Sequence, residues 1–149
     1  MVKVRLYLVR HGKTMFNTIG RAQGWSDTPL TTEGERGIQE LGIGLRESGL
    51  QFERAYSSDS GRTIQTMGII LEELGLQGKI PYRMDKRIRE WCFGSFDGAY
   101  DGDLFMGIIP RIFNVDHVHQ LSYAELAEGL VEVDTAAVSY THLTLPTKA

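Results

Sequence analysis

The strongest constraint on the fold is an apolar run over residues 2–9 that ends directly at Arg10, His11 and Gly12. Apolar and polar residues alternate at its start, and the run is continuous over residues 6–9, which is typical of a strand that enters a buried sheet. Ligands of α/β proteins usually bind beyond the carboxyl ends of such strands. We therefore expect the polar residues that follow this strand to lie at a ligand site.

The residues at the end of this predicted strand suit a phosphoryl group. Arg10 carries a permanent planar charge that can hold two phosphoryl oxygens at once. A neutral His11 can attack phosphorus through one ring nitrogen if the other nitrogen donates its proton to a fixed acceptor. Gly12 lets the backbone approach a ligand closely, and Thr14 and Asn17 add small polar side chains. The same spacing also fits a structural role, in which His11 only satisfies a buried backbone group.

Length and composition favour one ordinary domain. A chain of 149 residues can bury a sizeable core, and its net charge of -3 provides no field that would attract nucleic acid. The single cysteine, Cys92, excludes an internal disulfide and fits a reducing compartment. No run is long enough for a membrane span, and the N-terminus lacks a signal-peptide pattern. We therefore expect a cytoplasmic protein with neither a nucleic-acid nor a membrane partner.

Helix and strand patterns alternate after the first strand, which is the rhythm of an α/β domain. A turn-rich loop precedes a predicted helix that begins at Thr32, with Glu35 as its capping-box partner, and stops near Gly49. A second predicted helix is closed by Gly75. The apolar face expected for this helix consists of Ile64, Met67, Leu71 and Leu74.

Two further strands are predicted, over residues 52–57 and 79–84. Arg62 follows the first of them, and Glu90 follows the second. Neighbouring parallel strands would bring these side chains to the same sheet edge as the Arg10-His11 pair. A nucleophile, two cations that can hold an anion and a carboxylic acid that can donate a proton would then share one pocket.

The pattern beyond residue 100 is weaker. Residues 100–120 show no clear period, and we expect a lid or connector there. Ser122 and Glu125 form a capping-box pattern ahead of a short helix that should run to about Val133. Residues 138–149 show neither a cap nor a helical stripe, and we interpret them as a non-native tail. Residues 1–137 then form the N-terminal portion of one domain.

In these motifs the chain resembles the histidine phosphatase superfamily, the phosphoglycerate mutase-like enzymes, over residues 1–137. The matching residues are Arg10-His11-Gly12-x-Thr14-x-x-Asn17, Gln23-Gly24, Asp27-x-Pro29-Leu30-Thr31, Gly34, Tyr56-Ser57-Ser58, Arg62-Thr63 and Arg89-Glu90-x-x-x-Gly94-x-x-x-Gly98. Each motif alone is weak, but their order and spacing are specific. The resemblance implies a three-layer α/β sandwich with a mostly parallel central sheet, here incomplete at its C-terminus.

The resemblance also implies phosphoryl transfer from a small phosphorylated metabolite through a phosphohistidine. We favour a phosphatase over a mutase, and the sequence leaves both reactions open. The resemblance makes His11 the nucleophile and Glu90 the general acid and base, with Arg10 and Arg62 holding the phosphoryl oxygens. The substrate-binding residues that it implies are Asn17, Gln23 and Gly24. It requires neither a metal nor another cofactor, and it leaves the oligomeric state open.

One part of the family pattern is missing. The family has a second histidine, in a His-Gly motif that closes a later strand, whereas His142 here precedes Leu143 and lies in the suspected tail. Losing one transition-state donor typically costs about 10²- to 10³-fold in turnover, and an unpaired strand edge promotes association. We therefore expect a weakly active or inactive, association-prone chain. The alternative is a noncatalytic phosphate-binding relative or an inactive fragment.

Three other sites fit the sequence less well. A cysteine phosphatase would need an arginine six residues after Cys92, where the chain has Gly98. Asp101 and Asp103 have the spacing of an aspartate-nucleophile phosphatase, but no apolar strand precedes them. A metal site at His117-x-His119 would need a third ligand at suitable spacing. We therefore expect no chemistry from these residues.

Overall fold

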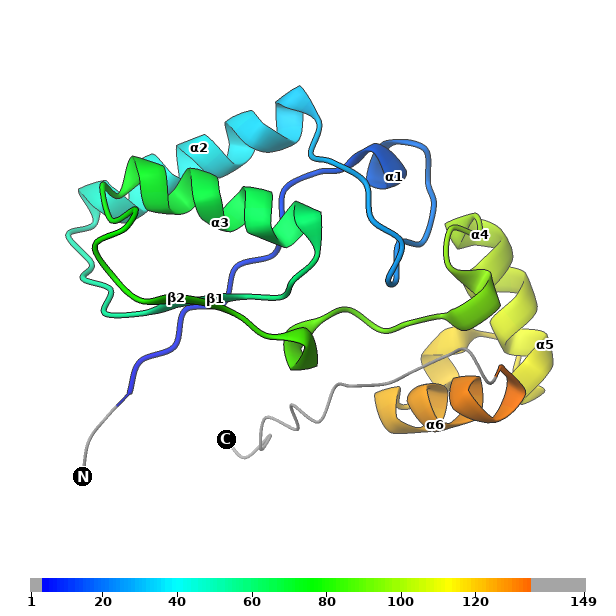
Figure 1. Ribbon diagram of the computed structural model, residues 1–149. Coiled ribbons are helices and arrows are strands. Elements are labelled where there is room, and N and C mark those ends of the chain that lie inside the picture. The colour runs from blue at the N-terminus through cyan, green and yellow to red at the C-terminus, as the bar shows by residue number, and fades with distance from the viewer. Residues whose placement is uncertain (1–3, 135–149) are drawn as a thin grey trace.

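The computed structural model describes residues 4–134. Two short strands, β1 (Ala55–Ser57) and β2 (Tyr82–Met84), pair in parallel, with Ala55 opposite Tyr82. Helices α2 (Thr32–Glu47) and α3 (Gly61–Glu73) form the layer that covers one face of this sheet (Figure 1). The α/β class and the parallel pairing predicted from the sequence are confirmed. Both strands are shorter than their predicted ranges.

The first apolar run does not form a strand. Residues 4–10 are extended but unpaired, and Val4, Leu6 and Leu8 are 86%, 66% and 74% exposed. The predicted buried strand is therefore wrong for this structure. An extended segment becomes a strand only when a neighbour takes up its N–H and C=O groups, and no strand within residues 4–134 does so. An edge contact between Tyr7 and Phe52, with ring centres 5.4 Å apart, joins the segment to the chain ahead of β1.

Helix α2 begins with a different cap from the one predicted. Thr31 is the N-cap, and its hydroxyl accepts the N–H of Gly34 at 3.0 Å. The predicted pair of Thr32 and Glu35 is wrong because the Glu35 carboxylate accepts from Gln65 of α3 at 2.7 Å instead. The helix ends at Glu47, close to the predicted stop.

The inner face of α3 also differs from the expected one. Its buried residues are Arg62, Thr66, Ile70 and Leu71. Of the four residues predicted to face inward, only Leu71 is buried, and Ile64 is 37% exposed. Two polar residues occupy the inward positions of the first turns because they serve the site described below. The helical period can therefore place polar residues on the inward face of a helix as readily as apolar ones.

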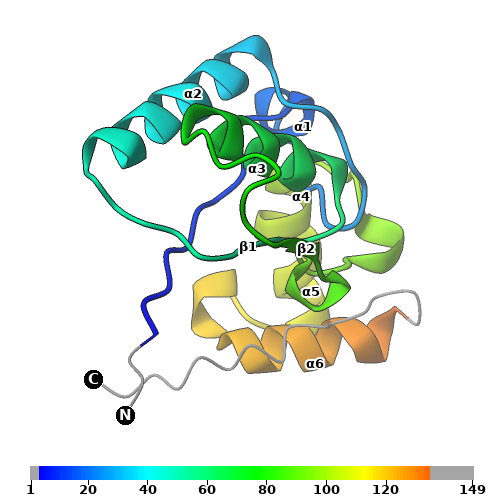
Figure 2. The same cartoon turned by 60° about the vertical axis from the view of Figure 1, so that its left-hand side comes forward.

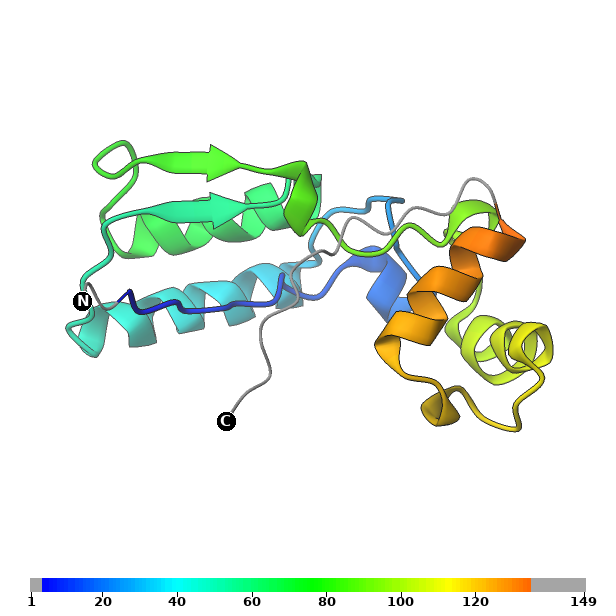
Figure 3. The same ribbon diagram turned by 90° about the horizontal axis from the view of Figure 1, so that it is seen from below.

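The remaining helices lie beyond the carboxyl ends of the strands (Figure 3). Residues 101–120, predicted as a lid or connector, are largely helical. Their elements are α4 (Asp101–Asp103), the π-helical turn η3 (Leu104–Ile108), α5 (Ile109–Phe113) and the 3₁₀ turn η4 (Val118–Gln120). Helix α6 (Tyr123–Val133) follows, and its predicted capping box is confirmed by Ser122 and Glu125. Figure 2 shows α6 on the side of the strands away from α2 and α3.

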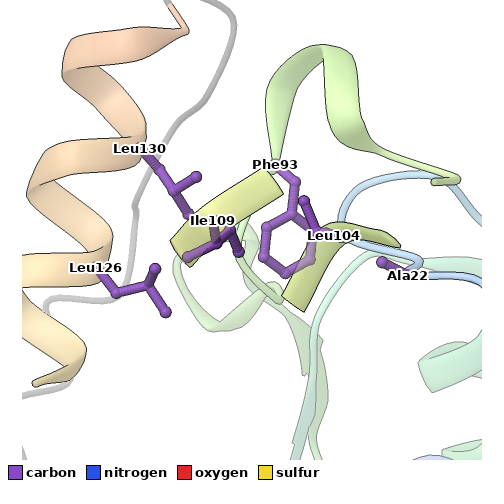
Figure 4. Packing of buried hydrophobic residues seen from close by; sticks show 6 residues of the cluster. All are labelled: Ala22, Phe93, Leu104, Ile109, Leu126 and Leu130. Atoms are coloured by element: carbon purple, nitrogen blue, oxygen red, sulfur yellow. The ribbon is translucent and has the colours of Figure 1, made fainter. Parts of the chain in front are cut away.

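A cluster of buried apolar residues holds these helices together. Its buried members are Ala22, Phe93, Leu104, Ile109, Leu126 and Leu130 (Figure 4). They come from the loop before α2, the segment after β2 and three later elements, η3, α5 and α6. Apolar burial therefore fixes these later elements against the loop and the segment. The suspected tail, residues 138–149, lies outside the described residues, and the predicted boundary at residue 137 stays a prediction.

Candidate active site

A cleft of about 570 Å³ is lined by residues of the segments before α2 and after β2 and by residues of the later helices. Its lining includes all seven predicted site residues, Arg10, His11, Asn17, Gln23, Gly24, Arg62 and Glu90. A second cavity of about 240 Å³ is also lined by Arg10, His11, Arg62 and Glu90. The imidazole of His11 therefore borders both cavities.

The hydrogen bonds of His11 select one tautomer. Its Nδ1 lies 2.8 Å from the carbonyl oxygen of Gly12, and a carbonyl can only accept, so Nδ1 donates. The neutral ring then carries a lone pair on Nε2, which has no hydrogen-bond partner within residues 4–134. Burial lowers the pKa of His11 below its ordinary value of 6.5; the bond to Gly12 opposes this shift, and the charges of Arg62 and Arg10 add to it. The ring is thus neutral near pH 7, as a nucleophile must be.

Two helices hold the turn that carries His11. The N–H of Gly12 donates to Oγ1 of Thr66 at 3.1 Å, and that hydroxyl donates to the carbonyl of Arg62 at 2.8 Å. A Cβ on Gly12 would lie 2.9 Å from the carbonyl oxygen of Gly34, and one on Gly34 would lie 2.1 Å from the carbonyl oxygen of Lys13. Both glycines are therefore needed for close approach. The sequence analysis missed Thr66, whose one signal is its position one turn after Arg62.

Arg62 is 2% exposed and clamps the loop over residues 23–27. Its Nη2 donates to the carbonyl of Gly24 at 2.9 Å, and its Nη1 donates to the carbonyl of Ser26 at 2.9 Å and to Asp27 at 3.1 Å. Its buried Nε has no partner among the described residues. Asp27 also accepts the N–H of Gly61 at 2.6 Å, at the start of α3. The clamp thus fixes the loop with three of the five guanidinium N–H groups, and the buried Nε–H and one Nη2–H have no partner in the described part of the chain.

The loop needs a glycine at position 24. Gly24 has φ +51°, and a Cβ there would lie 1.9 Å from Oδ1 of Asp97. The same carboxylate accepts the N–H groups of Trp25 at 2.8 Å, Ser26 at 3.2 Å and Phe93 at 2.9 Å. Asp97, which the sequence analysis did not single out, therefore joins the loop to the segment after β2. Its position just before Gly98 is the signal that could have identified it.

The two predicted amide side chains are partly committed to local structure. Oδ1 of Asn17, in α1 (Met15–Thr18), accepts the N–H of Thr14 at 3.1 Å and its hydroxyl at 3.0 Å. Oε1 of the buried Gln23 accepts the hydroxyl of Thr28 at 3.1 Å. The amide nitrogens of both residues therefore are the groups left to meet a ligand in the cleft.

Among the charged residues of the predicted site, Arg10 and Glu90 are exposed, whereas Arg62 is buried. One carboxylate oxygen of Glu90 accepts the N–H of Trp91 at 2.9 Å, and the carbonyl of Glu90 accepts from the indole of Trp25 at 3.0 Å. Arg89 fixes the same segment, since it donates to Asp59 at 2.5 Å and lies 4.6 Å from the ring centre of Trp25. The backbone at Glu90 is thus anchored while its carboxylate remains in the cleft.

A family model described as histidine phosphatase superfamily (branch 1) matches residues 6–104. The chain belongs to the histidine phosphatase superfamily. A phosphoglycerate mutase from Bacillus anthracis has a similar structure, with a TM-score of 0.74 and 34% identity over 86% of this chain and 57% of that one. A mycobacterial glucosyl-3-phosphoglycerate phosphatase gives a TM-score of 0.54 and 29% identity over 63% of this chain and 43% of its own.

Sequence relatives in the superfamily match over a shorter stretch. The 2,3-bisphosphoglycerate-dependent phosphoglycerate mutase of Treponema pallidum is 42% identical over 55 residues, which are 37% of this chain and 22% of the relative. This chain therefore spans a minor part of that relative's length and little more than half of the Bacillus structure. The superfamily contains both mutases and phosphatases, so membership alone does not select the reaction.

The other candidate sites add nothing to this superfamily assignment. Cys92 is half-buried, and His119 lines the cleft while His117 does not. No group of three potential metal-binding side chains occurs within residues 4–134. Over the same residues, no helix is long and apolar enough to cross a membrane. His142, the remaining histidine of the suspected tail, lies outside this range.

Proposed function

We propose that the chain catalyses phosphoryl transfer from a small phosphomonoester to water, with His11 as the nucleophile. The observation that carries this proposal is the Nδ1 to Gly12 hydrogen bond, because it holds the ring neutral with Nε2 free, in a cleft shared with Arg10 and Arg62. Arg10 and His11 lie in one loop, whereas Arg62 lies in the first turn of α3, far away in the sequence. A histidine that only satisfied a buried backbone group would not need two arginines beside it.

In the first step, Nε2 of His11 attacks phosphorus in line with the ester oxygen. The Nε2–P bond forms as the P–O ester bond breaks, and Glu90 donates a proton to the departing alcohol oxygen. Arg10 and the guanidinium of Arg62 would hold the equatorial oxygens, where charge must be neutralised, because both residues line the cleft beside His11. Asn17, Gln23 and Gly24 would bind the substrate around this centre.

In the second step, water attacks the phosphohistidine. Glu90 accepts a proton from the water, the Nε2–P bond breaks, and inorganic phosphate leaves with His11 neutral again. Water is favoured as the acceptor because Glu90 is exposed at the cleft, where solvent can reach its carboxylate. A mutase would instead need a second substrate hydroxyl at that position.

The decisive experiment traps the covalent intermediate. The full chain is incubated with a ³²P-labelled phosphomonoester, quenched, and examined for acid-labile, base-stable label on His11. His11→Ala should abolish the label, whereas His117→Ala, which changes a histidine outside the cleft lining, should retain it. Label without release of phosphate would identify a chain that forms but cannot hydrolyse the intermediate. Label that survives His11→Ala would refute the proposal.

A further inference from the structure

The cleft has two chemically different ends. The end described above is polar and carries the guanidinium, imidazole and carboxyl groups. The opposite wall comes from residues 91–126, and its apolar lining includes Trp91, Phe93, Phe105, Val118, Leu121 and Tyr123. A phosphomonoester whose phosphoryl group meets His11 would therefore direct the rest of its structure toward apolar side chains.

The same wall includes Asp101 and His119 but neither a lysine nor an arginine. Residues 91–134 contain one arginine and no lysine, and that residue, Arg111, is outside the cleft lining. The same stretch contains five aspartates and three glutamates. A carboxylate or second phosphate on the substrate would lose its hydration there and meet a negative field, which disfavours binding.

Arg21 lines the cleft but is committed elsewhere. Its Nη1 donates to the carbonyl of Gly98, and its guanidinium carbon lies 4.1 Å from the ring centre of Tyr100. These contacts hold the chain crossing between residues 21 and 100. Arg10 and Arg62 line both cavities together with His11, whereas Arg21 lines only the larger cleft and is directed toward Gly98 and Tyr100.

The aromatic side chains of the wall form a connected surface. Trp91 meets Phe93 edge to face, with ring centres 6.5 Å apart, and meets Tyr123 at 5.8 Å; Phe93 meets Phe105 at 5.8 Å. Tyr123 is 82% exposed although it lines the cleft. An exposed ring supported by a second ring offers a face on which an apolar group can pack.

We propose that the substrate is a phosphate monoester of an uncharged, apolar or aromatic alcohol, and that phosphoglycerates and bisphosphates are disfavoured. This inference rests on the proposed function for its chemistry. It assigns the wall over residues 91–126 the role of selecting the alcohol, with Tyr123 as a specificity residue.

Two primary alkyl phosphates with similar leaving groups test the inference. Phosphate release by the full chain is compared for benzyl phosphate and glycerol 3-phosphate, with 3-phosphoglycerate as the anionic case. Burial of a phenyl ring should raise kcat/KM for benzyl phosphate by about tenfold or more over glycerol 3-phosphate, and 3-phosphoglycerate should be slowest. Equal values, or a preference for 3-phosphoglycerate, would overturn the inference while leaving the phosphatase intact.

A binding measurement separates the two proposals. Calorimetry with benzylphosphonate and methylphosphonate needs no turnover. If no ester is hydrolysed but benzylphosphonate binds about tenfold more tightly, the proposed reaction fails and the ligand class stands. Equal binding of the two phosphonates, or binding of neither, overturns the ligand class.

Variants of two exposed tyrosines test whether the apolar wall causes the preference for benzyl phosphate. Tyr123→Ser should reduce the benzyl-to-glycerol ratio of kcat/KM several-fold, because the ring that packs on the phenyl group is removed. Tyr56→Ser is the matched control, since Tyr56 is 49% exposed on β1 and does not line the cleft. An unchanged ratio in Tyr123→Ser, or an equal loss in both variants, would overturn the role of Tyr123.

Discussion

Thr66 links the turn that carries His11 to Arg62: its Oγ1 accepts the N–H of Gly12 at 3.1 Å and donates to the carbonyl of Arg62 at 2.8 Å. The side chain is 5% exposed, so water does not replace these bonds easily. Through this one hydroxyl, helix α3 sets the position of the backbone next to His11. Thr66 is therefore a positioning residue that acts through the backbone of Gly12 and of Arg62.

Thr66→Val should impair both folding and turnover. The substitution keeps the shape but leaves the Gly12 N–H without an acceptor, which costs about 1–3 kcal/mol of unfolding free energy. We expect a larger fall in kcat than in substrate affinity, because the ring of His11 shifts while Arg62 stays. Urea unfolding and steady-state kinetics measure the two effects. Thr66→Ser restores the hydroxyl and should behave like the wild type; equal loss in both variants would contradict the role.

The pKa of His11 predicts how stability depends on pH. Burial lowers the pKa of His11 in the folded protein below 6.5, so the unfolded chain takes up the proton first as the pH falls. Stability should therefore be fully present above pH 6.5 and decrease as the pH falls toward the folded pKa. Denaturant unfolding between about pH 5 and pH 8 should show a steeper loss in the wild type than in His11→Gln. Parallel curves would show that the ring is not held neutral by the fold.

Two glycines with similar φ angles allow the cost of backbone strain to be distinguished from the cost of steric contact. Gly20 has φ +67° with no atom near a Cβ, whereas Gly24 has φ +51° and would place a Cβ against Asp97. Gly20→Ala should cost about 1–2 kcal/mol from backbone strain alone, and Gly24→Ala about 2–5 kcal/mol because the Asp97 carboxylate must also move. Thermal or urea unfolding gives both values. Similar losses would mean that Asp97 moves aside without cost.

Glu90→Gln tests whether Glu90 donates the proton, because the loss of activity should then depend on the leaving group of the substrate. Removal of a positioned acid typically costs about 10²- to 10⁴-fold, and the loss should appear with alkyl phosphates, whose alcohols need protonation. The loss should be much smaller with p-nitrophenyl phosphate, since p-nitrophenolate leaves without a proton. Glu40→Gln, an exposed carboxylate change on α2, serves as the control. Equal losses with both esters would assign Glu90 to binding instead of proton transfer.

Sequence patterns located the elements whose period or cap is local. The strands β1 and β2, the helices α2 and α3, and the capping box at Ser122 all followed from spacing within a few residues. The apolar run before Arg10 failed as a strand because strand formation depends on a neighbour, which no local pattern encodes. The cap of α2 shifted to Thr31 because Glu35 found a partner on another helix.

In the candidate site, too, features with a local sequence pattern were predicted and features that depend on distant partners were not. Family motifs indicated the seven cleft residues, although their individual roles stay predictions. Thr66 and Asp97 were not identified, because their importance lies in bonds to backbone N–H groups 54 and 72 residues away in the chain, at Gly12 and Trp25. Such bonds become visible only once the chain is folded.

The two sides of the cleft are built with unequal stiffness. The loop over residues 23–27 is held by Arg62, by Asp97 and by the Arg89 contact to Trp25, so small changes there would disturb the groups proposed to bind the phosphoryl oxygens. Tyr123 on the other side has a largely free surface. Under the proposed function, evolution could therefore exchange residues around α6 to admit new alcohols while the proposed nucleophile stays the same, which would let it serve successive metabolic roles.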